Sequence, residues 1–142
     1  MIDPMSAALR ALQADGDLRD LVAGRIAERH RFGMDVDPWS FPSKALQISL
    51  SSGGVPELSI AWQRPKLDVV CFGESPAEAS RVYLALVAAT RAIGRTIVHT
   101  SMGDALVYWL LIDGSPQAAY DPDLGIDTIL VSLDMAVSEE AV

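Results

Sequence analysis

The strongest structural signal in the sequence is KLDVVCFGESPAEASRVYLALVAATRAI, residues 66–93. Its first part alternates apolar and polar residues, which is the pattern of a half-buried strand, and Gly73 closes that run. Ser75 can then accept a hydrogen bond from the amide three residues on, Pro76 suits the first helical position, and Glu78 can reach back to the amide of the cap. The stretch therefore predicts a strand that leads directly into a helix.

The predicted helix runs from Ser75 to about Ile93 and stops at Gly94. Its apolar residues are spaced three and four apart, so they form one stripe along a single helix face. The stripe consists of Ala79, Val82, Leu86, Ala89 and Ile93. Because two alanines in it permit close packing, the sequence predicts a long helix laid on one face of a β-sheet.

Strand patterns flank this unit on both sides. Alternating or strongly apolar runs predict strands over residues 44–52, 58–72, 96–102, 105–112 and 127–137. Pro65 interrupts the second run, which is either bulged there or lies at a sheet edge. The predicted two-residue hairpin turn is Gly103-Asp104, whereas residues 113–116 and 120–125 are expected to be a chain break and a loop. Since hairpins join the strands, the sequence predicts an α+β fold with a mostly antiparallel sheet.

Two further helices are expected near the N-terminus. Asp3 can cap the first of them, with Pro4 at the position where a missing N–H costs nothing. The predicted cap of the short second helix is Asp17, and Gly24 is its stop signal. Both helices add to the layer that packs on the sheet.

A chain of 142 residues suits one domain, so residues 1–142 are expected to form a single α+β unit. Residues 28–43 form a predicted loop that is long for a compact domain, and such loops are usually functional. The loop carries three apolar aromatic residues: Phe32, Trp39 and Phe41. They either pack onto the domain or wait for a partner, and the tail 138–142 is expected to fray.

The charge distribution is lopsided. The formal net charge is −8, and all 11 Lys and Arg residues lie within residues 1–95. The remaining part holds the acids Asp104, Asp113, Asp121, Asp123, Asp127, Asp134, Glu139 and Glu140, without a single basic residue. Such a balance disfavours a broad nucleic-acid-binding surface. The acidic part is either a solvated, solubilising surface or an anionic face turned towards a partner or a lumen.

Candidate catalytic and metal-binding groups are few. His30 and His99 stand without carboxylates at a ligand spacing, and Cys71 alternates with apolar neighbours as a buried thiol does. The pairs Asp35/Asp37 and Asp121/Asp123 lack the further oxygen ligands of a cation loop and fit turns better. We expect neither catalysis nor a metal or cofactor. The sequence has no uncharged apolar run of about 18 residues and no signal-peptide start, so neither a membrane span nor a membrane partner is expected.

Three stretches give the chain a resemblance to the tail terminator (tail-completion) proteins of long-tailed bacteriophages, prophages and gene-transfer particles. Residues 9–26 combine a short helix with Asp-Leu-x-x-Leu-Val-x-Gly-x-Ile, and Ala23 is an extra residue before the glycine. Residues 64–93 lead from a basic residue through a strand ending in aromatic-Gly into Ser-Pro-x-Glu-Ala and an alanine-rich helix. Residues 111–136 contain Ile-Asp-Gly-Ser-Pro, then Tyr-Asp-Pro and a final alternating strand. Val70-Cys71-Phe72 departs from the family pattern, which has a tryptophan near the end of that strand, and the long 28–43 loop is a second departure.

The resemblance implies a structural virion protein of the phage tail, assembled in the cytoplasm of the bacterial host. Such a protein forms a homo-oligomeric ring, usually a hexamer, on the last ring of tail tube protein. It stops tube polymerisation and presents a surface to the head-side connector protein, while DNA passes through without specific binding. On this hypothesis some of Asp104, Asp113, Asp121, Asp123 and Asp127 line the channel or a rim, and Phe32, Trp39 and Phe41 lie at a subunit or tube interface.

Other function classes stay open at this point. A head-tail connector or another joining protein of similar fold would share the layout and the oligomeric assembly. A non-catalytic α+β module that binds a small molecule or peptide would need a pocket with convergent polar groups. An unrecognised hydrolase would need paired carboxylates or a nucleophile, neither of which the sequence indicates. Oligomer size separates the first two classes from the last two, because a ring closes through rotational symmetry.

Overall fold

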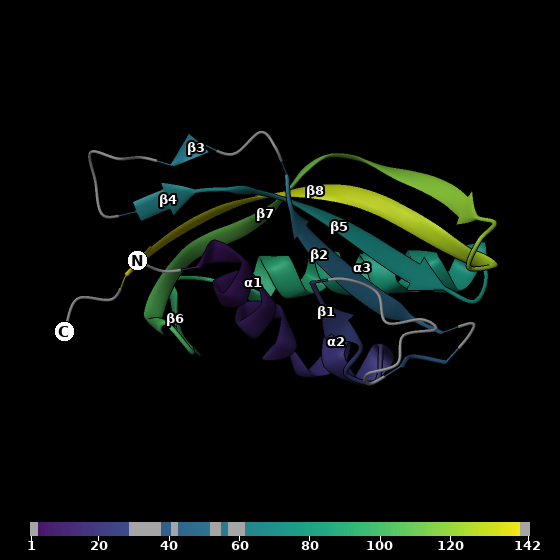
Figure 1. Ribbon diagram of the computed structural model, residues 1–142, viewed down its shortest axis with the longest axis horizontal. Coiled ribbons are helices and arrows are strands. Elements are labelled where there is room, and N and C mark those ends of the chain that lie inside the picture. Colours follow the sequence, from purple (N-terminus) through teal and green to yellow (C-terminus); the bar gives the residue numbers. More distant parts are fainter. Residues whose placement is uncertain (1–2, 29–37, 41–42, 52–54, 57–61, 140–142) are drawn as a thin grey trace.

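The computed structural model of the protein describes residues 3–28, 38–40, 43–51, 55–56 and 62–139. Three helices and eight strands follow one another along this part of the chain (Figure 1). Their bounds are α1 (Pro4–Gln13), α2 (Gly16–Leu21), β1 (Ile26–Ala27), β2 (Ala45–Leu50), β3 (Val55–Pro56), β4 (Trp62–Arg64), β5 (Lys66–Gly73), α3 (Pro76–Ala92), β6 (Thr96–Thr100), β7 (Gly103–Asp121) and β8 (Ile126–Glu139). The predicted α+β class is confirmed.

The strands form one curled, mostly antiparallel sheet organised around β8. One edge of β8 pairs with β5 and then, further along, with β4, while its other edge pairs with β7 over nearly the whole length of both strands. On the β5 side, β2 and the short parallel strand β1 extend the sheet, and β3 pairs with β4. On the far side, β6 pairs with the first residues of β7. The β7–β8 hairpin is therefore the longest feature of the molecule (Figure 1).

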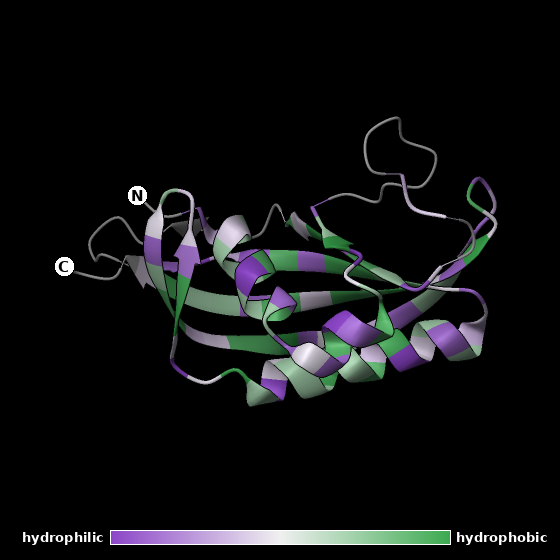
Figure 2. Ribbon diagram, turned by 90° about the horizontal axis from the view of Figure 1, so that it is seen from below, coloured by the Kyte–Doolittle hydropathy of each residue, from purple (hydrophilic) through white to green (hydrophobic). Residues whose placement is uncertain are grey.

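The three helices cover one face of this sheet, as the view from below shows (Figure 2). The stripe predicted for α3 lies against the sheet, with Ala79, Val82, Leu86 and Ala89 buried and Ile93 partly buried. Opposite them, β8 contributes its alternating apolar residues to the same core: Ile129, Val131, Leu133, Met135 and Val137. This burial confirms the period-two pattern predicted for residues 127–137.

The helix cap at Ser75 forms as predicted, but the second half of the capping box does not. Ser75 Oγ accepts a hydrogen bond of 3.2 Å from the amide of Glu78. The carboxylate of Glu78 pairs with two cations instead, and it lies 3.3 Å from Lys44 Nζ and 3.2 Å from Arg81 Nη1. Two cations compete successfully with a single backbone amide for this carboxylate, and the pairing ties the start of α3 to the start of β2.

At the N-terminus, one predicted cap is right and the other is wrong. Asp3 caps α1 by accepting from the amide of Met5 at 3.1 Å. The second helix is capped by Asp15, whose Oδ1 accepts from the amide of Leu18 at 2.9 Å, and Asp17 lies inside the first turn. Both aspartates precede the same apolar residue, so the pattern did not distinguish them. Gly24 ends the helix as predicted, with φ +77°.

The hairpin between β6 and β7 turns two residues earlier than predicted. Ser101 and Met102 form the turn, while Gly103 pairs with Thr100 as the first residue of β7. The side chain of Thr100 holds this turn, because its Oγ1 donates to the Gly103 carbonyl at 2.6 Å and accepts from the Met102 amide at 3.2 Å. Gly103 adopts φ +119°, which explains why a glycine is needed beside the turn rather than within it.

The chain break predicted for residues 113–116 is wrong, because β7 continues through it to Asp121. The segment is an irregularity within the strand: Asp113 pairs with Ser132 and Gln117 with Leu130, so the intervening residues of β7 outnumber those of β8. Gly114 supplies the left-handed conformation, with φ +85°. Among the described residues, no strand pairs with the outer edge of β7 here. The bulge and Pro116 therefore cost no ladder hydrogen bonds on that side.

Pro65 separates β4 from β5 but does not lie at a sheet edge. It is buried between two strands that pair with the same edge of β8, and its carbonyl accepts from the amide of Met135 at 3.3 Å. Neither predicted alternative holds, because the pairing with β8 keeps one register from Gln63/Val137 through to Lys66/Asp134, without a bulge. The predicted fraying of residues 138–142 is wrong for its first two positions, since Ser138 and Glu139 belong to β8. The remaining three residues lie outside the described part, as does much of the predicted 28–43 loop.

Candidate functional site

The five aspartates proposed for a channel or rim lie in three separate places. Asp121, Asp123 and Asp127 gather at the closed end of the β7–β8 hairpin, which we call the hairpin tip (residues 120–127). Asp121 Oδ1 accepts hydrogen bonds from the amides of Asp123 at 3.0 Å and Leu124 at 3.2 Å. Asp121 therefore stabilises the turn and also adds a negative charge to it. The tip also presents an exposed aromatic side chain, Tyr120, which is 60% exposed.

Asp113 lies halfway along the hairpin, on the sheet surface opposite the helices. We call this surface the helix-free face, and its central residues are Lys66, Asp68, Leu111, Asp113, Leu130, Ser132 and Asp134. The carboxylate of Asp113 pairs with Lys66 Nζ at 3.3 Å, and Asp134 lies 3.7 Å from Arg64. Leu111 is 53% exposed and Leu130 is 40% exposed on the same face. The helix-free face is thus a mixed surface with a small excess of carboxylates.

Asp104 lies at the opposite end of the hairpin from the tip. Its carboxylate is 2.7 Å from Nδ1 of His99 on β6, and both side chains are exposed. Asp104 lies 17 positions before Asp121 on β7, which corresponds to a path of about 55 Å along the strand. The structure therefore brings together three of the five aspartates and leaves the other two on different surfaces.

Of the three aromatic residues predicted for an interface, the structure describes Trp39. This side chain is partly buried and packs against a small apolar cluster on the helix-free face, formed by Ala45, Phe72 and Ile126. Trp39 thus packs onto its own chain, which was one of the two predicted alternatives. Phe32 and Phe41 lie outside the described residues.

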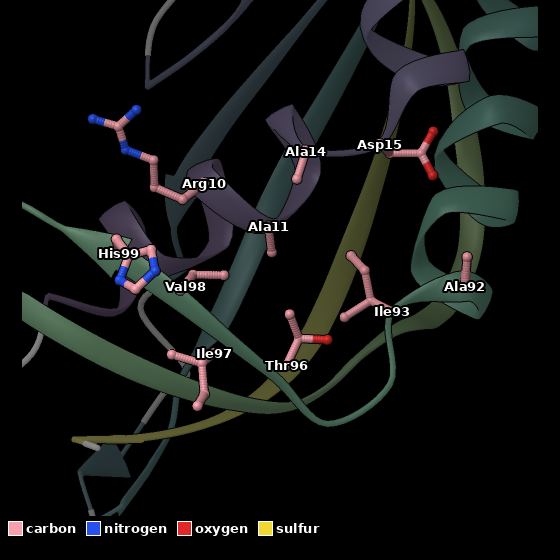
Figure 3. Close-up of a pocket in the computed structure, with 10 residues that line it drawn as sticks. All are labelled: Arg10, Ala11, Ala14, Asp15, Ala92, Ile93, Thr96, Ile97, Val98 and His99. Atoms are coloured by element: carbon pink, nitrogen blue, oxygen red, sulfur yellow. The ribbon is translucent and has the colours of Figure 1, made fainter. Parts of the chain in front are cut away.

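A groove that the sequence did not reveal opens where the C-terminal ends of α1 and α3 meet β6. It encloses about 430 Å³ and is lined by Arg10, Ala11, Ala14, Asp15, Ala92, Ile93, Thr96, Ile97, Val98 and His99. In Figure 3, Ala11 and Ala14 face the side chains of Ile93 and Thr96, with Arg10 and His99 at one end of the groove and Asp15 at the other. These residues come from three elements, so only tertiary structure assembles them.

Away from these surfaces, the reactive side chain of Cys71 is buried in the core. Burial raises the pKa of the Cys71 thiol to about 12, which confirms the predicted inert, buried cysteine. Within the described residues, no three His, Cys, Asp or Glu side chains are grouped as they would be around a metal ion. No helix in that part of the chain is both long enough and apolar enough to cross a membrane.

The sequence matches no protein-family model and no curated protein. The fold, in contrast, matches a chain from the virion of a native gene transfer agent (GTA) particle with a TM-score of 0.59. The match covers 90% of this chain and 89% of that chain, at 15% sequence identity. At this identity the likeness concerns the fold, and it extends over nearly all of both chains.

Proposed function

We propose that this protein is a structural virion component that caps a phage-type tail tube as a ring. In this role it stops tube polymerisation and offers its outer surface to the head-side connector protein. The observation that carries the proposal is the near-complete structural match to a chain of a gene transfer agent virion. Three sequence stretches similar to tail terminator proteins, residues 9–26, 64–93 and 111–136, support it independently.

The shape of the chain suits such a ring. Its long hairpin ends in an exposed acidic tip, and a groove opens beside β6 at the other end of the molecule (Figures 1 and 3). A protein with different surfaces at its two ends can associate head to tail, and head-to-tail contacts close into rings when the rotation between subunits permits. We expect a hexamer, the number usual in the family that the sequence resembles, and no catalytic step or cofactor.

The proposed channel wall is the helix-free face. It carries Asp68, Asp113 and Asp134 against Lys66 and Arg64, so its formal charge is negative by one unit. Repulsion between such a wall and the DNA phosphates would let DNA pass without adhering. The aspartates of the hairpin tip would then lie beyond the channel wall, and Asp104 would lie away from the channel.

A second structural role, that of a head-tail connector or joining protein, is compatible with the same fold match. A third, a non-catalytic binding module, draws on the groove, whose volume is within the range of ligand pockets of about 300–1,000 Å³. The two structural roles predict an assembly, whereas the binding module predicts a monomer or dimer. Phe32 and Phe41 are proposed contacts with the tube, as is the part of Trp39 that its own chain leaves exposed.

The test is to measure the mass of the purified protein by light scattering over a range of protein and salt concentrations, with negative-stain images of the same samples. Purified tail tubes that lack their cap are then added. We expect rings near six times the 15.2 kDa subunit mass, either free or at one end of the tubes, and tubes that no longer elongate. Rings that bind head connectors but ignore the tubes would favour the joining role. A monomer that neither oligomerises nor binds tube ends would refute both structural roles.

A further inference from the structure

We propose that the hairpin tip of one subunit docks into the groove between α1, α3 and β6 of the next copy of this chain. The inference rests on the proposed ring and names the contact that would build it. It joins Tyr120 and its neighbouring carboxylates on one copy to the apolar floor and arginine-bearing rim of the groove on the other. The contact is head to tail, so each subunit uses both surfaces once.

The groove suits a largely apolar occupant, because three of its four polar lining residues already have partners. Asp15 accepts from the Leu18 amide at 2.9 Å, Thr96 Oγ1 donates to the Gly94 carbonyl at 2.9 Å, and His99 lies 2.7 Å from Asp104. The surface that remains is formed largely by aliphatic side chains: Ala11, Ala14, Ile93 and Val98. Ala14 is exposed and Ile93 is only partly buried, so an occupant would remove their apolar surface from water.

The rim of the groove complements the charge of the hairpin tip. Arg10 lies at one end of the groove, and Asp15, whose Oδ1 accepts from the Leu18 amide, lies at the other. The tip carries Asp121, Asp123 and Asp127, and no Lys or Arg occurs after Arg95. Carboxylates on one copy would therefore meet the guanidinium group of Arg10 on the next.

A subunit cannot fill its own groove with its own tip. Gly73 pairs with Asp127 at the tip, just before α3 begins, whereas Ala92 and Ile93 at the end of α3 line the groove. The 17 residues of α3 therefore separate the two surfaces by about 25 Å. The two surfaces lie at opposite ends of the molecule, so their contact joins different copies and propagates in one direction. Tyr120 is the anchor, since a large aromatic side chain in an apolar pocket dominates such interfaces.

Cross-linking tests this contact in the full chain. A variant with both Ala14→Cys and Asp123→Cys places one thiol in the groove and one at the tip, and Cys71 stays unreactive because it is buried. A short bis-maleimide should convert this variant into a ladder of covalent oligomers, with and without capless tail tubes. A mixture of the two single-cysteine variants should stop at dimers. In the matched control, Leu84→Cys on the outer side of α3 replaces Asp123→Cys, and it should give no ladder.

The outcomes separate the contact from the proposed function. If mass measurements and microscopy show rings but the cross-linker gives no ladder, the proposed contact is wrong and the proposed ring is still supported. A double variant that stops at dimers would indicate a reciprocal two-fold contact and would also overturn it, as would a ladder of equal strength in the control. Absence of rings, ladder and tube binding together would overturn both. As a second readout, Tyr120→Ala should weaken self-association at least tenfold without lowering the melting temperature, whereas Leu130→Ala on the helix-free face should leave association unchanged.

Discussion

Gly73, the last residue of β5, lies so close to α3 that a methyl group on it would be 2.6 Å from the Cα atom of Ala79. The contact is between two backbones, so neither side can move aside as a flexible side chain would. Both residues are buried, and the strand turns into the helix cap at Ser75 within two residues. Because Gly73 has no side chain and Ala79 has only a methyl group, α3 can approach the sheet this closely.

Gly73→Ala should therefore destabilise the protein by about 1–3 kcal/mol, the usual cost of overpacking a core. Urea unfolding followed by circular dichroism measures this loss. The matched control is Gly16→Ala in α2, where a Cβ atom meets nothing within 4 Å. That change should be neutral or stabilise by about 0.4–1 kcal/mol, because alanine lowers the entropy of the unfolded chain. Equal effects of the two substitutions would contradict the close approach described above.

The buried thiol of Cys71 should make stability fall at alkaline pH. Burial raises its pKa from 9.0 to about 12, so the native state keeps the proton that the unfolded state releases. The stabilisation is complete below about pH 9 and is lost as the pH rises towards 12. Unfolding free energies measured from pH 7 to 10.5 should decline less steeply for Cys71→Ala, although this variant is less stable at neutral pH. Parallel slopes would argue that the thiol is accessible to water.

Glu78 should contribute to stability on the acid side. The hydrogen bond from Arg81, followed by that from Lys44, holds the pKa of this carboxyl below its ordinary value of 4.5. A lowered pKa in the folded state stabilises the protein above that ordinary value, and the contribution is lost as the pH falls through the lowered value. Glu78→Gln should flatten the decline of the melting temperature below pH 5. The control is Glu74→Gln, an exposed glutamate four residues earlier, which should leave the decline unchanged.

If the helix-free face lines a channel, its charge should govern contact with DNA. Asp113→Lys reverses one of the three carboxylates there and places the new cation near Lys66. Rings of this variant should retain double-stranded DNA in a gel-shift assay at low salt, and the retention should disappear at high salt. Asp104→Lys makes the same charge change at the far end of the hairpin and should cause no retention. Retention by both variants would indicate that overall charge, rather than the channel wall, excludes DNA.

Local patterns were sufficient to predict most elements of the fold. The period-two run of β8 and the Ser75 cap each report the environment of neighbouring residues along the chain, so the strand and the helix could be predicted with nearly their observed bounds. Errors arose where two local signals competed. Asp15 and Asp17 both suit a helix cap. Gly114 and Pro116 are typical of a loop, although here they form a bulge in an edge strand.

The surfaces for interaction were decided by tertiary structure. Sequence alone established that the acids concentrate after Arg95 and that catalytic motifs are lacking, because charge and motif content are properties of composition and order. It could not show that Asp113 pairs with Lys66, or that Asp104 and Asp121 lie at opposite ends of one hairpin. Nor could it reveal the groove, whose lining comes from α1, α3 and β6. Such relationships depend on strand register and helix packing, which bring residues together over distances in sequence that no local pattern records.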